Sequence, residues 1–325
     1  MIKNILITGG AGYIGSHIAD VLVKNKKKIF IVDNLETGYR RLINKKAKFY
    51  NTNINNFKKI KKILIKNKVD TVIHLAASIS INESKKNPKK FYKNNVVATS
   101  VLVKACQNNF VKNFIFSSTA AVYKDTNNKV NEKSIIKPKS IYGKTKKKAE
   151  DIIIKNFKGK KINYAILRYF NVVGASDNKK IGPIKKNDTL FKNLAMSIIG
   201  KNHIIRVYGC NYKTKDGSCV RDYVHVSDLA DMHNKVLNKI DKTKKSVILN
   251  CGYGKGISVI QAAKAFIKYS KKKIKLVYEN KRPGDLASSI ASNKKIKKYI
   301  QWSPKHKDLS TIVKSCIEWE SKLSK

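Results

Sequence analysis

The chain has 325 residues, 42% hydrophobic and 9% aromatic, so it can bury a sizeable core and is not a disordered protein. Its five cysteines are scattered without a CxxC pair, which excludes a disulfide-rich scaffold and predicts free thiols in a reducing cytoplasm. No apolar run approaches the ~20 residues of a membrane span, and the first residues lead directly into an apolar strand. We therefore expect neither a membrane partner nor a signal peptide.

The charge is strongly positive, since 70 basic against 21 acidic residues give a formal +49. One hypothesis is a nucleic-acid-binding protein, because a basic surface attracts phosphates. The other is compositional drift toward lysine, asparagine and isoleucine, as AT-rich genomes produce. Drift is favoured because lysines are spread over the whole length and only six basic residues are arginine, the residue suited to bidentate contacts. We expect nonspecific polyanion binding but no specific nucleic-acid partner.

Short apolar runs alternate with helical patterns through the first half of the chain. Strands are predicted at residues 5–7, 29–32, 71–75, 114–117 and 164–167, and helices at 14–24, 57–67, 95–108 and 142–155. Such alternation indicates a parallel sheet covered on both faces. The predicted fold class is α/β: a Rossmann-type doubly wound parallel sheet in residues 1–173, to which later segments return, and a smaller C-terminal α/β substrate domain in residues 174–325.

A glycine-rich turn joins the first predicted strand to the first helix. It places Gly9, Gly12 and Gly15 where backbone N–H groups can approach a pyrophosphate at a helix N-terminus. Asp33 ends the second strand, where a carboxylate can accept hydrogen bonds from an adenosine ribose and would repel a 2′-phosphate. The residues therefore predict an NAD-binding domain, with NAD favoured over NADP. The alternative is a glycine turn that only packs the helix on the strand.

A possible proton-transfer pair lies at the start of the helix predicted at 142–155. Tyr142 and Lys146 are four residues apart and share a helix face. A nearby ammonium lowers the pKa of a tyrosine and makes it usable as a general base. Tyr-x-x-x-Lys alone would be chance in so lysine-rich a chain, but here it follows the glycine turn and Asp33 in order. Thr119, after the strand at 114–117, is the predicted hydroxyl partner for the reacting oxygen.

Together these features resemble the UDP-glucose 4-epimerases of the extended short-chain dehydrogenase/reductase superfamily. The resemblance runs in collinear order from about residue 3 to Trp319. It is carried by the segments 32–38 (VDNLETG), 74–77 (HLAA), 94–96 (NNV), 117–123 (SSTAAVY), 167–171 (LRYFN), 217–226 (GSCVRDYVHV), 250–256 (NCGYGKG) and 282–285 (RPGD).

The resemblance implies an enzyme that contains NAD and interconverts UDP-glucose and UDP-galactose. The residues that it implies for the cofactor are Tyr13 and Ile14 at the pyrophosphate, Asp33, Asn34, Leu35 and Thr37 at the adenosine, Leu75, Ala76, Ala77 and Asn94 along the channel, and Phe170 beside the nicotinamide. Those that it implies for the UDP-sugar are Asn171, Arg221, Arg282 and Asp285. Arginines at two of these places suit a diphosphate.

Three positions depart from the family pattern. Asn53 stands where an aspartate commonly meets the adenine, before Ile54, so we expect weaker adenine binding. Ile141 replaces a proline common just before the tyrosine. Lys192 stands where an apolar residue or proline is common in the uridine-binding loop. We expect these changes to weaken cofactor and substrate binding more than they reduce activity.

The expected reaction is reversible C4 epimerisation of a UDP-hexose through a 4-keto intermediate, with Tyr142, Lys146 and Thr119 as catalytic residues. Ser289, small where some relatives carry tyrosine beside the sugar C2 substituent, predicts that N-acetylated UDP-hexoses are accepted as well. The alternatives are a sugar-nucleotide 4,6-dehydratase or decarboxylase, or a non-catalytic NAD-binding or nucleic-acid-binding protein on the same fold. Dehydratases carry an Asp-Glu pair where this chain has Ala120 and Ala121.

No metal is expected, because the six histidines include no HExxH motif and none pairs with cysteine at zinc spacing. His74 and His225 are predicted to be structural. The resemblance also implies a homodimer in which the helices from 95 and 142 build a four-helix bundle with a second copy. An apolar stripe of Val97, Val101, Leu102 and Ala105 supports it, unless the stripe faces only its own sheet.

Overall fold

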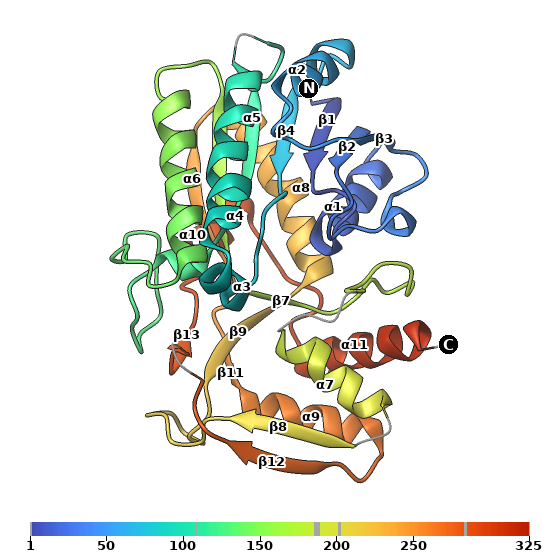
Figure 1. Cartoon of the computed structure of the whole chain (residues 1–325), viewed down its shortest axis with the longest axis vertical. Coiled ribbons are helices and arrows are strands. Elements are labelled where there is room, and N and C mark those ends of the chain that lie inside the picture. Colours follow the sequence, from blue (N-terminus) through green and yellow to red (C-terminus); the bar gives the residue numbers. More distant parts are fainter. Residues whose placement is uncertain (1, 108, 185–188, 201–202, 283–284, 325) are drawn as a thin grey trace.

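The large sheet is parallel and has seven strands in the order β10-β6-β5-β4-β1-β2-β3 (Figure 1). This computed structural model describes residues 2–107, 109–184, 189–200, 203–282 and 285–324. The strands are β1 (Asn4–Thr8), β2 (Lys28–Asp33), β3 (Lys48–Asn51), β4 (Thr71–His74), β5 (Asn113–Thr119), β6 (Asn163–Tyr169) and β10 (Val247–Cys251). The order reverses between β1 and β4, and ligands of such sheets bind at the carboxyl ends of the strands beside that point.

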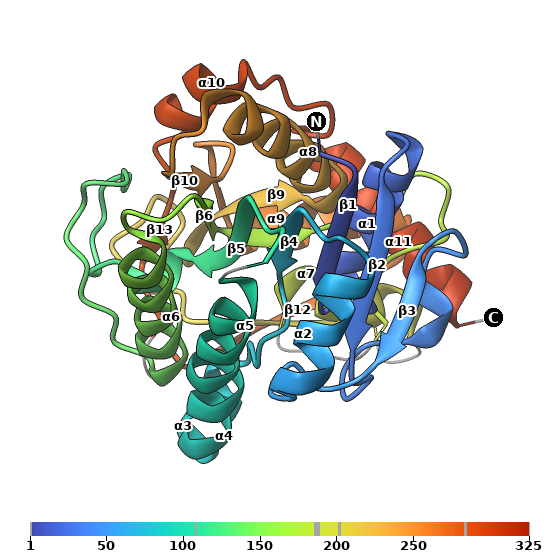
Figure 2. The same ribbon diagram turned by 90° about the horizontal axis from the view of Figure 1, so that it is seen from above.

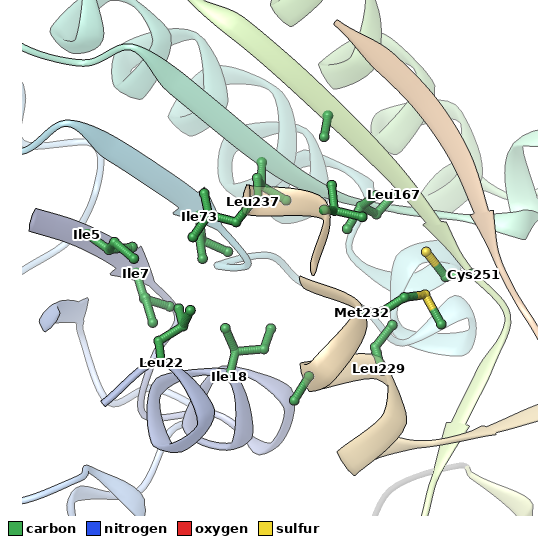
Figure 3. Packing of buried hydrophobic residues seen from close by; sticks show 14 of the residues in the cluster. Ile5, Ile7, Ile18, Leu22, Ile73, Leu167, Leu229, Met232, Leu237 and Cys251 are labelled. Carbon is green, nitrogen blue, oxygen red and sulfur yellow. The ribbon is translucent and has the colours of Figure 1, made fainter. Parts of the chain in front are cut away.

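Helices cover both faces of this sheet, because the strands between its edges are largely apolar and buried on both sides. One face carries α1 (Tyr13–Lys24), α8 (Val226–Thr243) and α10 (Lys294–Ile300). The other carries α2 (Phe57–Lys66), α5 (Ala98–Cys106) and α6 (Ile141–Phe157) (Figure 2). Figure 3 shows Ile18 and Leu22 of α1 on the side of Ile7 of β1, and Leu229 and Met232 of α8 farther along the same layer, near Cys251 of β10.

A smaller unit lies at the carboxyl edge of the large sheet (Figure 1). Its strand β9 (Val220–His225) pairs with β7 (Asn171–Val173), β11 (Gly256–Ser258) and β13 (Ser288–Ser289), and β8 (Ile204–Tyr208) pairs with β12 (Lys275–Glu279). The helices α7 (Leu190–Ile199), α9 (Val259–Ser270) and α11 (Leu309–Leu323) share its core. Three elements that follow residue 174, namely α8, β10 and α10, pack with the large sheet instead. The boundary between residues 173 and 174 stays a prediction.

Every strand and helix predicted from the apolar pattern is present, with small differences at the ends. The helix expected at 95–108 is a π-helical turn, Lys93–Val97, followed by α5, which ends at Cys106; residue 108 lies outside the described residues. The pattern did not predict β3, which has only two apolar residues, or any of the elements that follow β6, β10 included. It also missed the short helices α3 (Ile81–Lys86) and α4 (Pro88–Tyr92).

Candidate active site

The glycine turn between β1 and α1 is shaped for close approach of a ligand. Gly9 has a φ of +72°, and a Cβ there would lie 2.7 Å from the backbone nitrogen of Ala76. A Cβ on Gly15 would collide with the Gly9 carbonyl. Helix α1 begins at Tyr13, and its N-cap, Gly12, has no side chain to satisfy the first N–H groups. The turn therefore fits the pyrophosphate of a dinucleotide.

Asp33, at the end of β2, ties this turn to the loop that follows. Its carboxylate accepts hydrogen bonds from the backbone N–H of Ala11 at 3.0 Å and of Leu35 at 2.9 Å. Burial raises the pKa of Asp33, and the two hydrogen bonds oppose this shift. Asn34 and Thr37, which we expect at the adenosine, lie in the same loop. A carboxylate has about four acceptor sites, so Asp33 keeps capacity for the hydroxyls of a ribose.

The opposite wall follows β4, at residues 75–77, and rests on a buried histidine. His74 Nδ1 lies 2.7 Å from the Thr8 hydroxyl, and its Nε2 lies 2.9 Å from the Thr99 hydroxyl. Burial, together with the charge of Lys146, lowers the pKa of His74 to about 3, so the ring is neutral. His74 thus has the structural position that the sequence led us to expect.

The π-helical turn Lys93–Val97 brings two asparagines to this wall. Asn94 donates to the Ser78 hydroxyl at 3.0 Å. Asn95 is buried, exchanges hydrogen bonds with the Ser78 backbone and donates to the Thr145 hydroxyl at 3.0 Å. The sequence led us to choose Asn94, and the contacts of Asn95 were not predicted. A π-helical turn that interrupts an α-helix is frequent at functional sites, so it is a structural signal that points to these asparagines.

Asn53 and Ile54, predicted at the adenine, follow β3. Asn53 is exposed, and its side-chain oxygen accepts the backbone N–H of Asn55 at 2.9 Å. Ile54 is buried in the core under the sheet. Asn53 is thus committed to a local turn, in keeping with the weaker adenine contact that we expect.

The three predicted catalytic residues come together where β5 ends and α6 begins. The Ser140 hydroxyl caps α6 by accepting the N–H of Gly143 at 3.0 Å, which places Tyr142 and Lys146 on the first turns. The Thr119 side chain acts on the Tyr142 hydroxyl and favours its phenolate form. Lys146 is 3% exposed, and its ammonium lies 4.2 Å from the centre of the Phe116 ring.

Burial dominates the electrostatics of this trio. It lowers the pKa of Lys146 to about 7, against the opposing charge of Glu150. It raises the pKa of Tyr142 to about 12, and the Thr119 side chain opposes this only in part. The expectation that the Lys146 ammonium lowers the pKa of Tyr142 is therefore wrong, because burial raises this pKa and Lys146 is not among the groups that shift it. A further positive charge near Tyr142 is needed to lower its pKa enough for the phenolate to form near neutral pH.

A buried polar network that sequence reasoning missed lies behind the trio. Arg168 donates to both oxygens of Glu150, from Nε at 3.0 Å and from Nη2 at 2.8 Å. The Ser118 hydroxyl donates to the same carboxylate at 2.5 Å, and Arg168 Nη1 donates to the Tyr123 hydroxyl at 3.0 Å. The available signal was an arginine inside an apolar strand together with a glutamate four residues after Lys146.

The predicted substrate residues divide into two groups. Asn171 lies on β7 opposite Tyr223, and Arg221 lies on the neighbouring β9 opposite Ser289 of β13, so one small sheet carries all three predicted residues. Phe170, just before β7, is buried, and its N–H donates to the carbonyl of Cys251. Phe170 and Asn171 directly follow the carboxyl end of β6.

Arg282 and Asp285 form the second group and are exposed. The Arg282 guanidinium stacks 3.7 Å from the centre of the Tyr208 ring, and the N–H of Asp285 donates to the Arg282 carbonyl at 3.2 Å. Residues 283–284 of the same motif lie outside the described residues. Among the described residues, neither of the two is hydrogen-bonded to Arg221.

Lys192 does not lie in a loop, contrary to expectation. It is buried on α7, where its ammonium donates to Glu320 of α11 at 2.5 Å and to the carbonyl of Pro183 at 3.1 Å. The partner carboxylate explains how lysine is tolerated at this position.

No group of three or more potential metal ligands occurs among the described residues. His225 is buried and stacks on His306, with ring centres 4.4 Å apart, in a structural setting. In the same described ranges, no helix is long and apolar enough to cross a membrane.

A dinucleotide cradle beside a tyrosine placed for proton exchange defines an enzyme of the short-chain dehydrogenase/reductase class. Residues 5–252 match the NAD dependent epimerase/dehydratase family, and the chain belongs to it. A UDP-glucose 4-epimerase of Lactobacillus helveticus is 37% identical over 317 residues, covering 97% of this chain and 96% of that protein.

Solved structures agree with this assignment. A UDP-glucose 4-epimerase from Stenotrophomonas maltophila, with bound NAD and formylated UDP-arabinopyranose, has a TM-score of 0.95 at 30% identity and covers 99% of both chains. The UDP-Glc/GlcNAc 4-epimerase of Campylobacter jejuni has a TM-score of 0.86 at 36% identity, covering 98% of this chain and 99% of that one. The predicted resemblance to UDP-glucose 4-epimerases, the Rossmann-type fold, the epimerase class and the cofactor NAD are confirmed.

Proposed function

We propose that the chain catalyses reversible C4 epimerisation of UDP-glucose and UDP-galactose, with Tyr142 as the base. The observation that carries this proposal is the convergence of Tyr142, Thr119 and the buried Lys146 at the edge of the sheet that also holds the glycine turn. The Tyr142 phenolate takes the proton of the C4 hydroxyl, and Thr119 donates to the oxygen that becomes a carbonyl. After the sugar rotates, Tyr142 returns the proton.

The cofactor fits the cradle described above. The glycine turn with Tyr13 and Ile14 holds the pyrophosphate, Asp33 the ribose, and residues 75–77 with Asn94 the channel. NAD bound there supplies a reversible hydride acceptor and a positive charge. Lys146 contributes a second positive charge, and the two together offset the burial that raises the pKa of Tyr142.

The substrate groups suit a nucleoside diphosphate sugar. Arg221 and Arg282 each offer a guanidinium fork for the diphosphate, and Asn171 and Asp285 provide polar contacts. Ser289 adjoins Arg221 in the register of the small sheet, so a small side chain lies beside the group that holds the substrate. We infer that N-acetylated UDP-hexoses are substrates as well.

A dehydratase is the rival reaction. It requires a carboxyl pair directly after Thr119 to eliminate the C6 hydroxyl, and the short turn there, Ala120–Val122, has only apolar side chains. Epimerisation needs no such acid and is favoured.

The test is Tyr142→Phe with UDP-galactose, read by coupled oxidation of UDP-glucose. We expect a loss of about 1,000-fold or more in kcat, because the proton acceptor is removed while the ring remains. NAD content after denaturation should equal that of the wild type, which shows that the cradle is intact. Turnover near the wild-type rate with NAD retained would exclude Tyr142 as the base.

We also propose a homodimer in the cytoplasm. Exposed apolar side chains gather on the segment before α5, at Ile79, Ile81, Tyr92 and Val97. An apolar groove of about 350 Å³ between Pro88 and the start of α6 adjoins them. A second copy would cover this surface. Five free cysteines suit a reducing compartment.

The apolar stripe expected on α5 is only partly available for this contact. Leu102 and Ala105 are buried against the chain's own sheet, whereas Val97 is exposed and Val101 half-buried. The dimer therefore rests on the exposed residues before α5 rather than on the whole stripe. A sedimentation mass of one chain at micromolar concentration would contradict it.

A further inference from the structure

One buried carboxylate joins the three elements that carry the predicted reaction centre. Glu150 of α6 is fully buried. Its carboxylate accepts two hydrogen bonds from the Arg168 guanidinium of β6, at 3.0 and 2.8 Å, and one from the Ser118 hydroxyl of β5, at 2.5 Å. The carboxylate thereby fixes α6 against both strands at once.

Each of these contacts is next to a residue of the proposed reaction. Ser118 directly precedes Thr119, and Arg168 lies two residues before Phe170 on the way to the substrate strand. Glu150 is four residues after Lys146, on the same face of α6. A shift of this carboxylate would therefore displace Thr119, Tyr142 on α6 and Phe170 beside the expected nicotinamide at the same time.

The groups around Lys146 determine whether its side chain is charged. Its ammonium lies over the Phe116 ring of β5, and its charge acts on His74 of β4. The cation of Arg168 is held on the far side of the same carboxylate, Glu150. His74 is neutral, and burial disfavours the charge on Lys146. Glu150 supplies the negative charge that acts in the opposite direction.

We propose that Glu150 is a positioning residue of the epimerase, which aligns Thr119 and Tyr142 and keeps the Lys146 ammonium charged. This inference rests on the function proposed above. Loss of the Glu150 charge should lower the pKa of Lys146, so that Lys146 becomes neutral at a lower pH. Because a neutral Lys146 no longer stabilises the Tyr142 phenolate, activity should then be lost at a lower pH as well.

The test is Glu150→Gln, which keeps the size of the side chain and removes its charge. We expect the high-pH limb of kcat to move down by about one pH unit, with KM changed little. A second readout is independent of turnover. In protein labelled with ¹⁵N-lysine, the Lys146 signal, identified by its absence from Lys146→Met, should titrate at a correspondingly lower pH.

Two further variants separate this role from general stability. Glu320→Gln breaks the other buried ion pair, with Lys192, and should leave both the pH limb and the Lys146 titration unchanged. Glu150→Leu with Arg168→Met replaces the pair by apolar side chains and should fold even if Glu150→Gln does not. It should show a downward shift of the same sign but smaller size, because the Arg168 cation is removed together with the carboxylate. Unchanged Lys146 titration in the variant that folds would overturn the inference. A wild-type protein without turnover would instead contradict the proposed function, and the titration would still decide the role of Glu150.

Discussion

Lys192 shows at the scale of one residue how a charge is tolerated in a core. Its ammonium and the Glu320 carboxylate are both nearly inaccessible, and the Pro183 carbonyl takes a further hydrogen bond. Lys192→Met would leave Glu320 buried without its cation, so the free energy of unfolding should fall by about 3–5 kcal/mol in urea titrations. Lys192→Met combined with Glu320→Leu should recover most of this loss. A single variant within about 1 kcal/mol of the wild type would show that the pair is unimportant.

Ser289 makes a prediction about substrate choice at the same scale. Its hydroxymethyl group stands next to Arg221 across the small sheet. Ser289→Tyr should lower kcat/KM for UDP-N-acetylglucosamine roughly 10- to 100-fold, because overpacking costs about 1–3 kcal/mol. The value for UDP-galactose serves as the internal control and should change much less. Equal effects on both sugars, or a wild-type enzyme that ignores the N-acetyl sugar, would show that Ser289 does not select the substrate.

At the scale of elements, one lysine connects the two sides of the proposed cofactor channel. Lys90 of α4 pairs with Glu36, within the adenosine loop, at 2.8 Å and with Glu83 of α3 at 3.0 Å. These carboxylates raise the pKa of Lys90. The ion pair holds the loop after β2 against the segment that leads to Asn94, and so it should slow the escape of NAD.

Lys90→Met should therefore release NAD faster, by roughly two- to fivefold, because exposed ion pairs contribute about 0.2–1 kcal/mol. Release is measured as cofactor fluorescence after dilution of the purified holoenzyme. High salt should accelerate release from the wild type and have a smaller effect on the variant. Lys86→Met, on α3, is the matched control. If Lys90→Met and Lys86→Met release NAD at the same rate, Lys90 does not secure the channel.

Elements with a continuous apolar pattern were predictable, and those held by tertiary contacts were not. Residues 71–75 and 164–167 are apolar runs, and the sheet places β4 and β6 there. By contrast, β3 is an edge strand with exposed ends, and α3 and α4 are too short to show a period. The π-helical turn at Lys93–Val97 depends on the bonds of Asn95 to Ser78 and Thr145, which no local pattern encodes.

The residues of the candidate site also fall into a group that the sequence predicted and a group that it did not. The glycine turn, Asp33 and Tyr142 with Lys146 were predictable because their chemistry depends on short spacings within one segment. The Glu150–Arg168 pair joins two elements and was missed. The sign of the Tyr142 pKa shift was also missed, because it depends on burial, and burial is set by the packed molecule.

At the scale of the whole molecule, buried histidines set how stability depends on pH. Burial lowers the pKa of His17 and His233 to about 4 and of His74 and His225 to about 3. In the unfolded chain these rings take up protons near pH 6.5, so their contribution to stability is lost as the pH falls below that value. Asp222 acts in the opposite direction, because burial raises its pKa to about 6 and the folded state then holds a proton that the unfolded chain releases.

The histidines outnumber Asp222, so unfolding between pH 6 and 5 should take up about three protons, and the free energy of unfolding should fall by up to about 4 kcal/mol per pH unit. Urea titrations at pH 7, 6 and 5 measure this slope. The formal charge of +49 also repels itself more strongly as histidines protonate, so the series is repeated in 0.5 M NaCl, which screens surface charges within about 4–5 Å. Proton uptake by buried histidines persists in salt, whereas surface repulsion is screened. A midpoint that is flat from pH 7 to 5 in high salt would show that these rings are protonated in the folded protein.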